Sequence, residues 1–143
     1  MSNIQPIKTE KVDKLHVKVY NDRKALGAAA GAEAAAKIKQ LLANKAEIRI
    51  VFAAAPSQNE FLETLRADPD IDWSRVTAFH MDEYIGLPED APQKFSRFLR
   101  DRIFDIVKPG RVHLIDSSNS AEAECKRYGD LIREAPIDVV CLG

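Results

Sequence analysis

Short apolar segments alternate with helical segments along this chain, and this alternation constrains its fold more than any other feature. Strand patterns occupy residues 15–20, 48–53, 76–81, 112–115 and 137–142. Helical patterns occupy residues 22–44, 58–66, 95–108 and 121–134. Parallel neighbouring strands need crossover helices, so the order predicts a Rossmann-like, three-layer α/β fold with a mainly parallel sheet. We expect residues 1–143 to be the amino-terminal part of one domain, truncated after its fifth strand.

The first helical segment is rich in alanine, and its apolar residues recur near the helical period. Gly27 and Gly31 oppose an unbroken helix, because each costs about 1 kcal/mol relative to alanine in a helix interior. The high alanine content favours an unbroken helix.

Charge and hydropathy exclude several classes of function. The 143 residues contain 21 basic and 22 acidic side chains with no long block of either sign, which argues against nucleic-acid and membrane partners. The longest apolar stretches fall well below the roughly 20 residues of a membrane helix, and the start MSNIQPIKTEK has no secretory core. We therefore expect a cytoplasmic protein. Cys125 and Cys141 have no metal-ligand spacing, and we expect both to be small buried residues.

The first candidate site follows the strand at 48–53. Ser57 and Glu60 have the spacing of a capping box, which would begin a helix at the ligand-binding edge of the sheet. Backbone N–H groups at such a helix start can hold a phosphate. Alternatively the box only satisfies the helix N–H groups, as most such boxes do.

The second candidate site follows the strand at 76–81. Asp82 and Glu83 are adjacent carboxylates where an α/β fold puts its active site, and neighbouring side chains diverge, so at most one points at a substrate. Such an acid could act as a general base. The alternative is a surface loop with two solvated acids. His80 is expected in the core or behind the site, and no pair of histidines has metal-ligand spacing, so we predict no metal.

The segment FHMDEYIGLP at residues 79–88 resembles the F-x-M-D-E-Y-x-G-L-P segment of glucosamine-6-phosphate deaminases, also called isomerases. The likeness continues at residues 95–99, 124–128 and 138–143. The resemblance implies a sugar-phosphate enzyme without a cofactor, which converts glucosamine 6-phosphate to fructose 6-phosphate and ammonia. It gives Asp82 the role of the base that moves a proton between the second and first carbons of the opened sugar. A small sugar phosphate is then the partner, and a homo-oligomer is left open.

The resemblance also implies a phosphate loop made by Ala54, Ala55, Ser57 and Gln58. The family usually has T-G-S-T-P or T-G-G-T-P there, whereas this chain has AAAPS at residues 53–57. Alanine disfavours positive φ, so we expect a different path or only right-handed conformations. The family continues after the fifth strand with a G-x-G-x-x-G-H-I-A-F loop that bears the ring-opening histidine. We therefore expect little turnover from residues 1–143 alone.

Two other functions remain open. The related 6-phosphogluconolactonases have a loop resembling D-E-R, and Tyr84 argues against that hydrolase. A non-catalytic sugar-phosphate-binding protein would be consistent with the altered phosphate loop.

Overall fold

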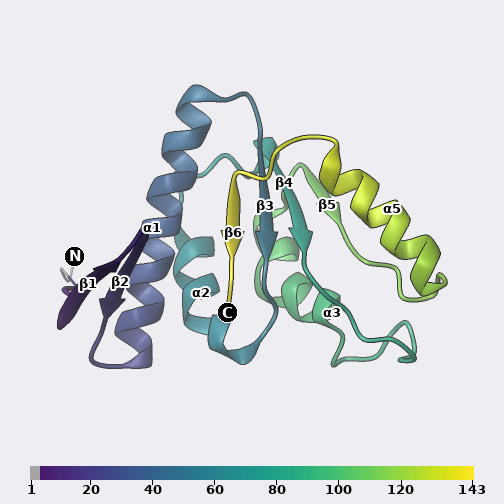
Figure 1. The fold of residues 1–143 in the computed structure, drawn as a ribbon, viewed down its shortest axis with the longest axis horizontal. Helices are drawn as coiled ribbons and strands as arrows, with labels where there is room; N and C mark the ends of the chain where they lie inside the picture. The colour runs from purple at the N-terminus through teal and green to yellow at the C-terminus, as the bar shows by residue number, and fades with distance from the viewer. Residues whose placement is uncertain (1–3) are drawn as a thin grey trace.

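The structure of the protein, a computed structural model, describes residues 4–143 and is built on a four-stranded parallel sheet (Figure 1). Its strand order is β5-β4-β3-β6, and every neighbouring pair is parallel. The strands are β3 (Ile48–Phe52), β4 (Val76–His80), β5 (Arg111–His113) and β6 (Val139–Cys141). The predicted parallel sheet is therefore confirmed.

Helices cover both faces of this sheet. One face carries α1 (Arg23–Asn44), α2 (Asn59–Ala67) and a helix that starts as α3 (Phe95–Leu99), passes through the π-helical turn η3 (Arg100–Phe104) and ends as α4 (Asp105–Val107). The other face carries α5 (Ala121–Arg133). The three layers are visible in Figure 1, and they confirm the predicted architecture. Within residues 4–143, the structure contains no helix with the length and apolarity needed to cross a membrane.

Strand β3 shows why its continuous apolar pattern predicts burial on both faces. Ile48, Ile50 and Phe52 belong to the core cluster under α1, α2 and α3. Val51 belongs to the smaller cluster under α5, together with Phe79. Because successive side chains of a strand point to opposite faces, one five-residue segment contributes to both cores.

Arg49 is the charged exception in this strand. It is buried on the α5 side, where its guanidinium donates to the backbone oxygens of Leu131, Ile132 and Ala135. It also lies over the ring of Phe79, 4.8 Å from the centroid. A helix leaves its last carbonyls without partners, and Arg49 supplies donors for three carbonyls at and just beyond the end of α5.

The first predicted strand lies outside the parallel sheet, which corrects the expectation of a five-stranded layer. Strand β2 (Leu15–Val19) forms a two-stranded antiparallel sheet with β1 (Lys8–Val12). The connection is short because Val12 pairs with Leu15 directly, and Asp13 adopts a φ of 54° in the turn. A two-residue connection can join only antiparallel strands.

Helix α1 is unbroken, and its two glycines are packing positions. Both are buried against α2. A Cβ at Gly27 would lie 2.3 Å from Cβ of Glu60, and one at Gly31 would lie 2.8 Å from the backbone oxygen of Phe61. The glycines therefore let two helices approach more closely than any side chain would allow.

Candidate functional site

The two candidate loops leave the sheet side by side. In the parallel pair of β3 and β4, Phe52 is in register with His80, the last residue of each strand. The chain therefore emerges at one edge as residues 53–58 and, beside them, as residues 81–83. This is the edge at which parallel α/β folds bind ligands.

Glu83 is committed to the backbone. Its carboxylate accepts hydrogen bonds from the N–H groups of Tyr84 (3.1 Å), Phe95 (2.9 Å) and Ser96 (3.1 Å) and so caps the start of α3. Burial acts to raise the pKa of Glu83, but these hydrogen bonds outweigh it and hold the pKa below the ordinary value for glutamate. Glu83 is therefore an ionised structural group.

Asp82 is the free carboxylate of the pair. It is exposed, and its carboxylate makes no hydrogen bond or ion pair with any residue from 4 to 143. It lines a cavity of about 450 Å³ between the loop after β4 and helix α5. Other residues that line this cavity are Met81, Ile85, Ile115, Asp116, Asn119 and Cys125. Glu83 lines the same cavity, so the two acids differ in their hydrogen bonds and not in the cavity that they line.

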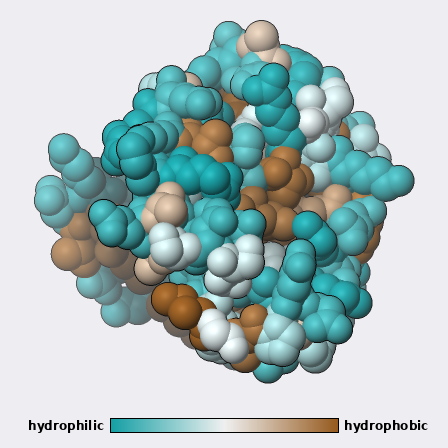
Figure 2. All heavy atoms as spheres, turned by 90° about the vertical axis from the view of Figure 1, so that its right-hand side faces the viewer, coloured by the Kyte–Doolittle hydropathy of each residue, from teal (hydrophilic) through white to brown (hydrophobic). Residues whose placement is uncertain are grey.

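The side of the molecule with α5 faces the viewer in Figure 2, where hydrophobic side chains are visible among a mainly hydrophilic surface. Cys125, on α5, is exposed, which corrects the expectation that both cysteines are buried; Cys141 is buried as expected. Burial raises the pKa of the Cys141 thiol to about 12.

The loop after β3 avoids left-handed conformations. Ala55 is extended, with φ −158° and ψ 155°, and none of Ala53 to Gln58 has a positive φ. Ala54 is buried in the core. The N–H of Ala53 donates to Cys141 and that of Gln58 to Ala55, whereas those of Ala54 and Ala55 donate to no acceptor within residues 4–143. The predicted path without positive φ is confirmed.

The capping box predicted for Ser57 and Glu60 is wrong. A 3₁₀ turn, η1 (Pro56–Gln58), precedes α2, and the helix has no side-chain cap. The Glu60 carboxylate instead accepts two 2.8 Å hydrogen bonds from Nε of Arg23 on α1. Those hydrogen bonds lower the pKa of Glu60. The Glu60 carboxylate therefore pairs with Arg23, which lies far away in the sequence, and not with the backbone N–H groups at the start of α2.

Ser57 and Gln58 line a second cavity of about 470 Å³, together with Arg23, strand β6 and the two residues that follow it, Leu142 and Gly143. Asp82 lies in the first cavity, so the predicted residues occupy two separate hollows. Ala54 and Ala55 line neither of them. The sheet edge brings the two loops together, but the described residues do not enclose them in one pocket.

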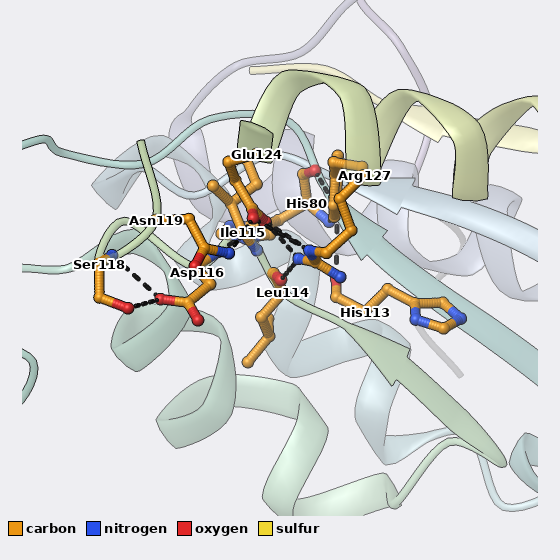
Figure 3. A network of polar contacts seen from close by, with 10 residues as sticks. His80, His113, Leu114, Ile115, Asp116, Ser118, Asn119, Glu124 and Arg127 are labelled. Atoms are coloured by element: carbon orange, nitrogen blue, oxygen red, sulfur yellow. Dashed lines mark hydrogen bonds and ion pairs between the residues drawn. The ribbon is translucent and has the colours of Figure 1, made fainter. Parts of the chain in front are cut away.

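A polar network around α5 holds the end of β4, and its role was not predicted from the sequence (Figure 3). The hydroxyl of Tyr128 accepts from the His80 N–H at 3.0 Å and donates to the His80 oxygen at 2.7 Å. Burial raises the pKa of Tyr128 to about 12, so the hydroxyl keeps its proton. The sequence places Tyr128 on the apolar face of a helix, and only the fold shows that it faces a strand end.

Glu124 and Arg127 fix the loop between β5 and α5 in the same network (Figure 3). The Glu124 carboxylate is buried, pairs with Arg127, and accepts from the N–H of Asp116 at 2.9 Å and from Nδ2 of Asn119 at 2.7 Å. The hydrogen bonds from Arg127 are the main cause that lowers the pKa of Glu124 to about 2. Arg127 also donates to the oxygen of Leu114 at 2.9 Å. One wall of the Asp82 cavity is therefore rigidly held.

Among residues 4–143, no three side chains of His, Cys, Asp or Glu are grouped so that they could hold a metal ion.

Comparison with known proteins identifies the family. The family model described as "Glucosamine-6-phosphate isomerases/6-phosphogluconolactonase" matches residues 21–143. The chain belongs to this family. A glucosamine-6-phosphate deaminase of Exiguobacterium is 34% identical over 107 residues, which are 74% of this chain and 42% of that relative. The family resemblance inferred from residues 79–88 is confirmed.

Solved structures of the family have the same fold. A monomeric glucosamine-6-phosphate deaminase superposes with a TM-score of 0.67 and 25% identity, over 78% of this chain and 47% of that one. The 6-phosphogluconolactonase of Thermotoga maritima superposes with a TM-score of 0.69 and 28% identity, over 77% of this chain and 50% of that one. The chain therefore spans half or less of the length of these relatives.

Proposed function

We propose that the whole protein converts glucosamine 6-phosphate to fructose 6-phosphate and ammonia, with Asp82 as the general base. The observation that carries the proposal is the contrast between two adjacent acids. Glu83 accepts hydrogen bonds from three backbone N–H groups. Asp82 has no hydrogen-bond or ion-pair partner within residues 4–143, and it lines a cavity at the carboxyl edge of the sheet. The curated relative from Exiguobacterium is named a glucosamine-6-phosphate deaminase, which supports the same reaction.

In the proposed reaction, Asp82 removes the proton from the second carbon of the opened sugar and returns it to the first carbon. A water molecule then hydrolyses the imine left at the second carbon, which gives the ketone and releases ammonia. A carboxylate with a lone pair free to face the substrate can act as this base. We propose that the phosphate lies at the loop after β3. The free N–H groups of Ala54 and Ala55 support this, as does the hydroxyl of Ser57 beside the amide of Gln58 at the start of α2.

The test is ammonia release from glucosamine 6-phosphate by the protein at the full length at which it is expressed. Asp82→Asn should lower kcat by at least about 100-fold, because general-base catalysis contributes roughly 10² to 10⁴. Its circular dichroism spectrum should match that of the wild type. Asp90→Asn is the matched control, since Asp90 is an exposed acid on the same loop. A wild-type protein that releases no ammonia, or an Asp82→Asn variant that releases it normally, would refute the proposal.

A lactonase is the second candidate, because 6-phosphogluconolactonases are among the structures that superpose on this chain. Hydrolysis of 6-phosphogluconolactone without ammonia release would favour it. Calorimetry that detects tight sugar-phosphate binding without either turnover would favour a non-catalytic binding protein.

A further inference from the structure

The end of β4 is held by side chains as well as by its neighbouring strands. Its pairing with β5 stops at Phe79, which is in register with His113. One residue later, the backbone of His80 is held by the hydroxyl of Tyr128, which accepts from its N–H and donates to its oxygen. Tyr128 reaches this point from the α5 face of the sheet. On the side that faces β5, the strand therefore ends at a side chain, one residue after its pairing with β5 stops.

The ring of His80 makes a second attachment. Its Nε2 accepts a hydrogen bond from the backbone N–H of Ile115 at 2.8 Å, beyond the end of β5. His80 is fully buried, and burial lowers its pKa to about 4, so the ring is neutral and Nδ1 carries the proton. Nδ1 has no partner within residues 4–143. The imidazole thus acts as an acceptor that joins the ends of two strands.

Asp82 lies between this attachment and the next one. Two residues before it, His80 is fixed through both its backbone and its ring; immediately after it, Glu83 is fixed by the start of α3. Since Asp82 itself makes no hydrogen bond to residues 4–143, its position depends on these neighbours. A displacement of about 1 Å can reduce a rate by about 100-fold.

We propose that His80 is a positioning residue, which sets the place of the Asp82 carboxylate in its cavity by tying the end of β4 to Ile115. This inference rests on the proposed function and goes beyond it, because it assigns a role to a residue that does not touch the substrate. A histidine that merely fills the core would need only its volume. A positioning residue needs an acceptor where Nε2 stands.

Two substitutions separate these roles. The side-chain oxygen of glutamine can take the place of Nε2, whereas that of asparagine reaches only as far as Nδ1. In the full-length protein, His80→Asn should lower kcat for ammonia release by about 10- to 100-fold and leave KM within about twofold. His80→Gln should restore kcat to within about threefold of the wild type. His16→Asn, on the exposed face of the hairpin, is the control and should change neither constant.

The outcomes are distinguishable. If the wild type releases ammonia but His80→Asn keeps its kcat, or if glutamine fails to restore the rate in a folded protein, the inference is wrong and the proposed function survives. If the wild type releases no ammonia, both are wrong. Should His80→Asn fail to fold, His80→Leu decides instead, because leucine fills a comparable volume but offers no acceptor where Nε2 stands. A kcat reduced by about tenfold at constant KM supports the inference, and an unchanged kcat overturns it.

Discussion

The contact between α1 and α2 leads to a prediction whose sign is opposite to that of helix propensity. Replacing Gly31 by alanine should stabilise an isolated helix by about 1 kcal/mol. In the folded protein the new Cβ would lie 2.6 Å from Cβ of Thr64 and 2.8 Å from the backbone oxygen of Phe61. A backbone atom cannot rotate away, so α2 must shift, and overpacking of this kind costs about 1–3 kcal/mol. With a cost near the upper end, the net loss is about 1–2 kcal/mol.

Urea unfolding followed by circular dichroism measures this difference, and the midpoint should fall for Gly31→Ala. The reverse change at an exposed position of the same helix, Ala36→Gly, is the matched control. It should cost about 1 kcal/mol through propensity alone. If Gly31→Ala is more stable than the wild type, α1 and α2 do not approach so closely that a methyl group at residue 31 is excluded.

Two further predictions concern ionisable groups near the site. His80 has a folded pKa of about 4 against 6.5 in the unfolded chain, so the unfolded state binds the extra proton between these values and stability is lost as the pH falls from about 6.5 to about 4. The charges beside it are Glu83, which raises its pKa, and Lys94, which lowers it. His80→Gln should flatten the stability profile by up to about 1.4 kcal/mol per pH unit, and equal slopes for the two proteins between pH 7 and 5 would contradict this. Glu83→Ala should cost about 1–2 kcal/mol in urea unfolding because the start of α3 loses its acceptor; a loss below about 0.5 kcal/mol would show that the cap contributes little.

The parallel sheet could be predicted from sequence because β3 and β4 are short, apolar and followed by helices of the right period. The hairpin could not, because β1 is a mainly polar segment, KTEKV, and nothing local distinguishes its pairing with β2 from a place in the larger sheet. The burial of Gly31 was equally hidden, since the residues that need its missing side chain are on another helix.

The candidate site was predictable to the same extent. Asp82 follows a recognisable strand, so its place at the sheet edge could be inferred. The partners of Glu60 and His80 could not, because both are decided by residues far along the chain: Arg23 lies 37 positions from Glu60, and Tyr128 lies 48 positions from His80. The spacing of Ser57 and Glu60 predicted a helix cap, whereas Glu60 forms an ion pair with Arg23.

The Glu83 carboxylate accepts hydrogen bonds from the N–H groups of Tyr84 and Phe95, and so holds together the two ends of the loop formed by residues 84–94. The extra methylene of glutamate makes this possible; an aspartate would fall short of the Phe95 N–H by roughly 1.5 Å, one carbon–carbon bond. Asp82 and Glu83 could therefore not exchange places. Because Glu83 fixes both ends of this loop, the loop can become longer or shorter in evolution without moving Asp82.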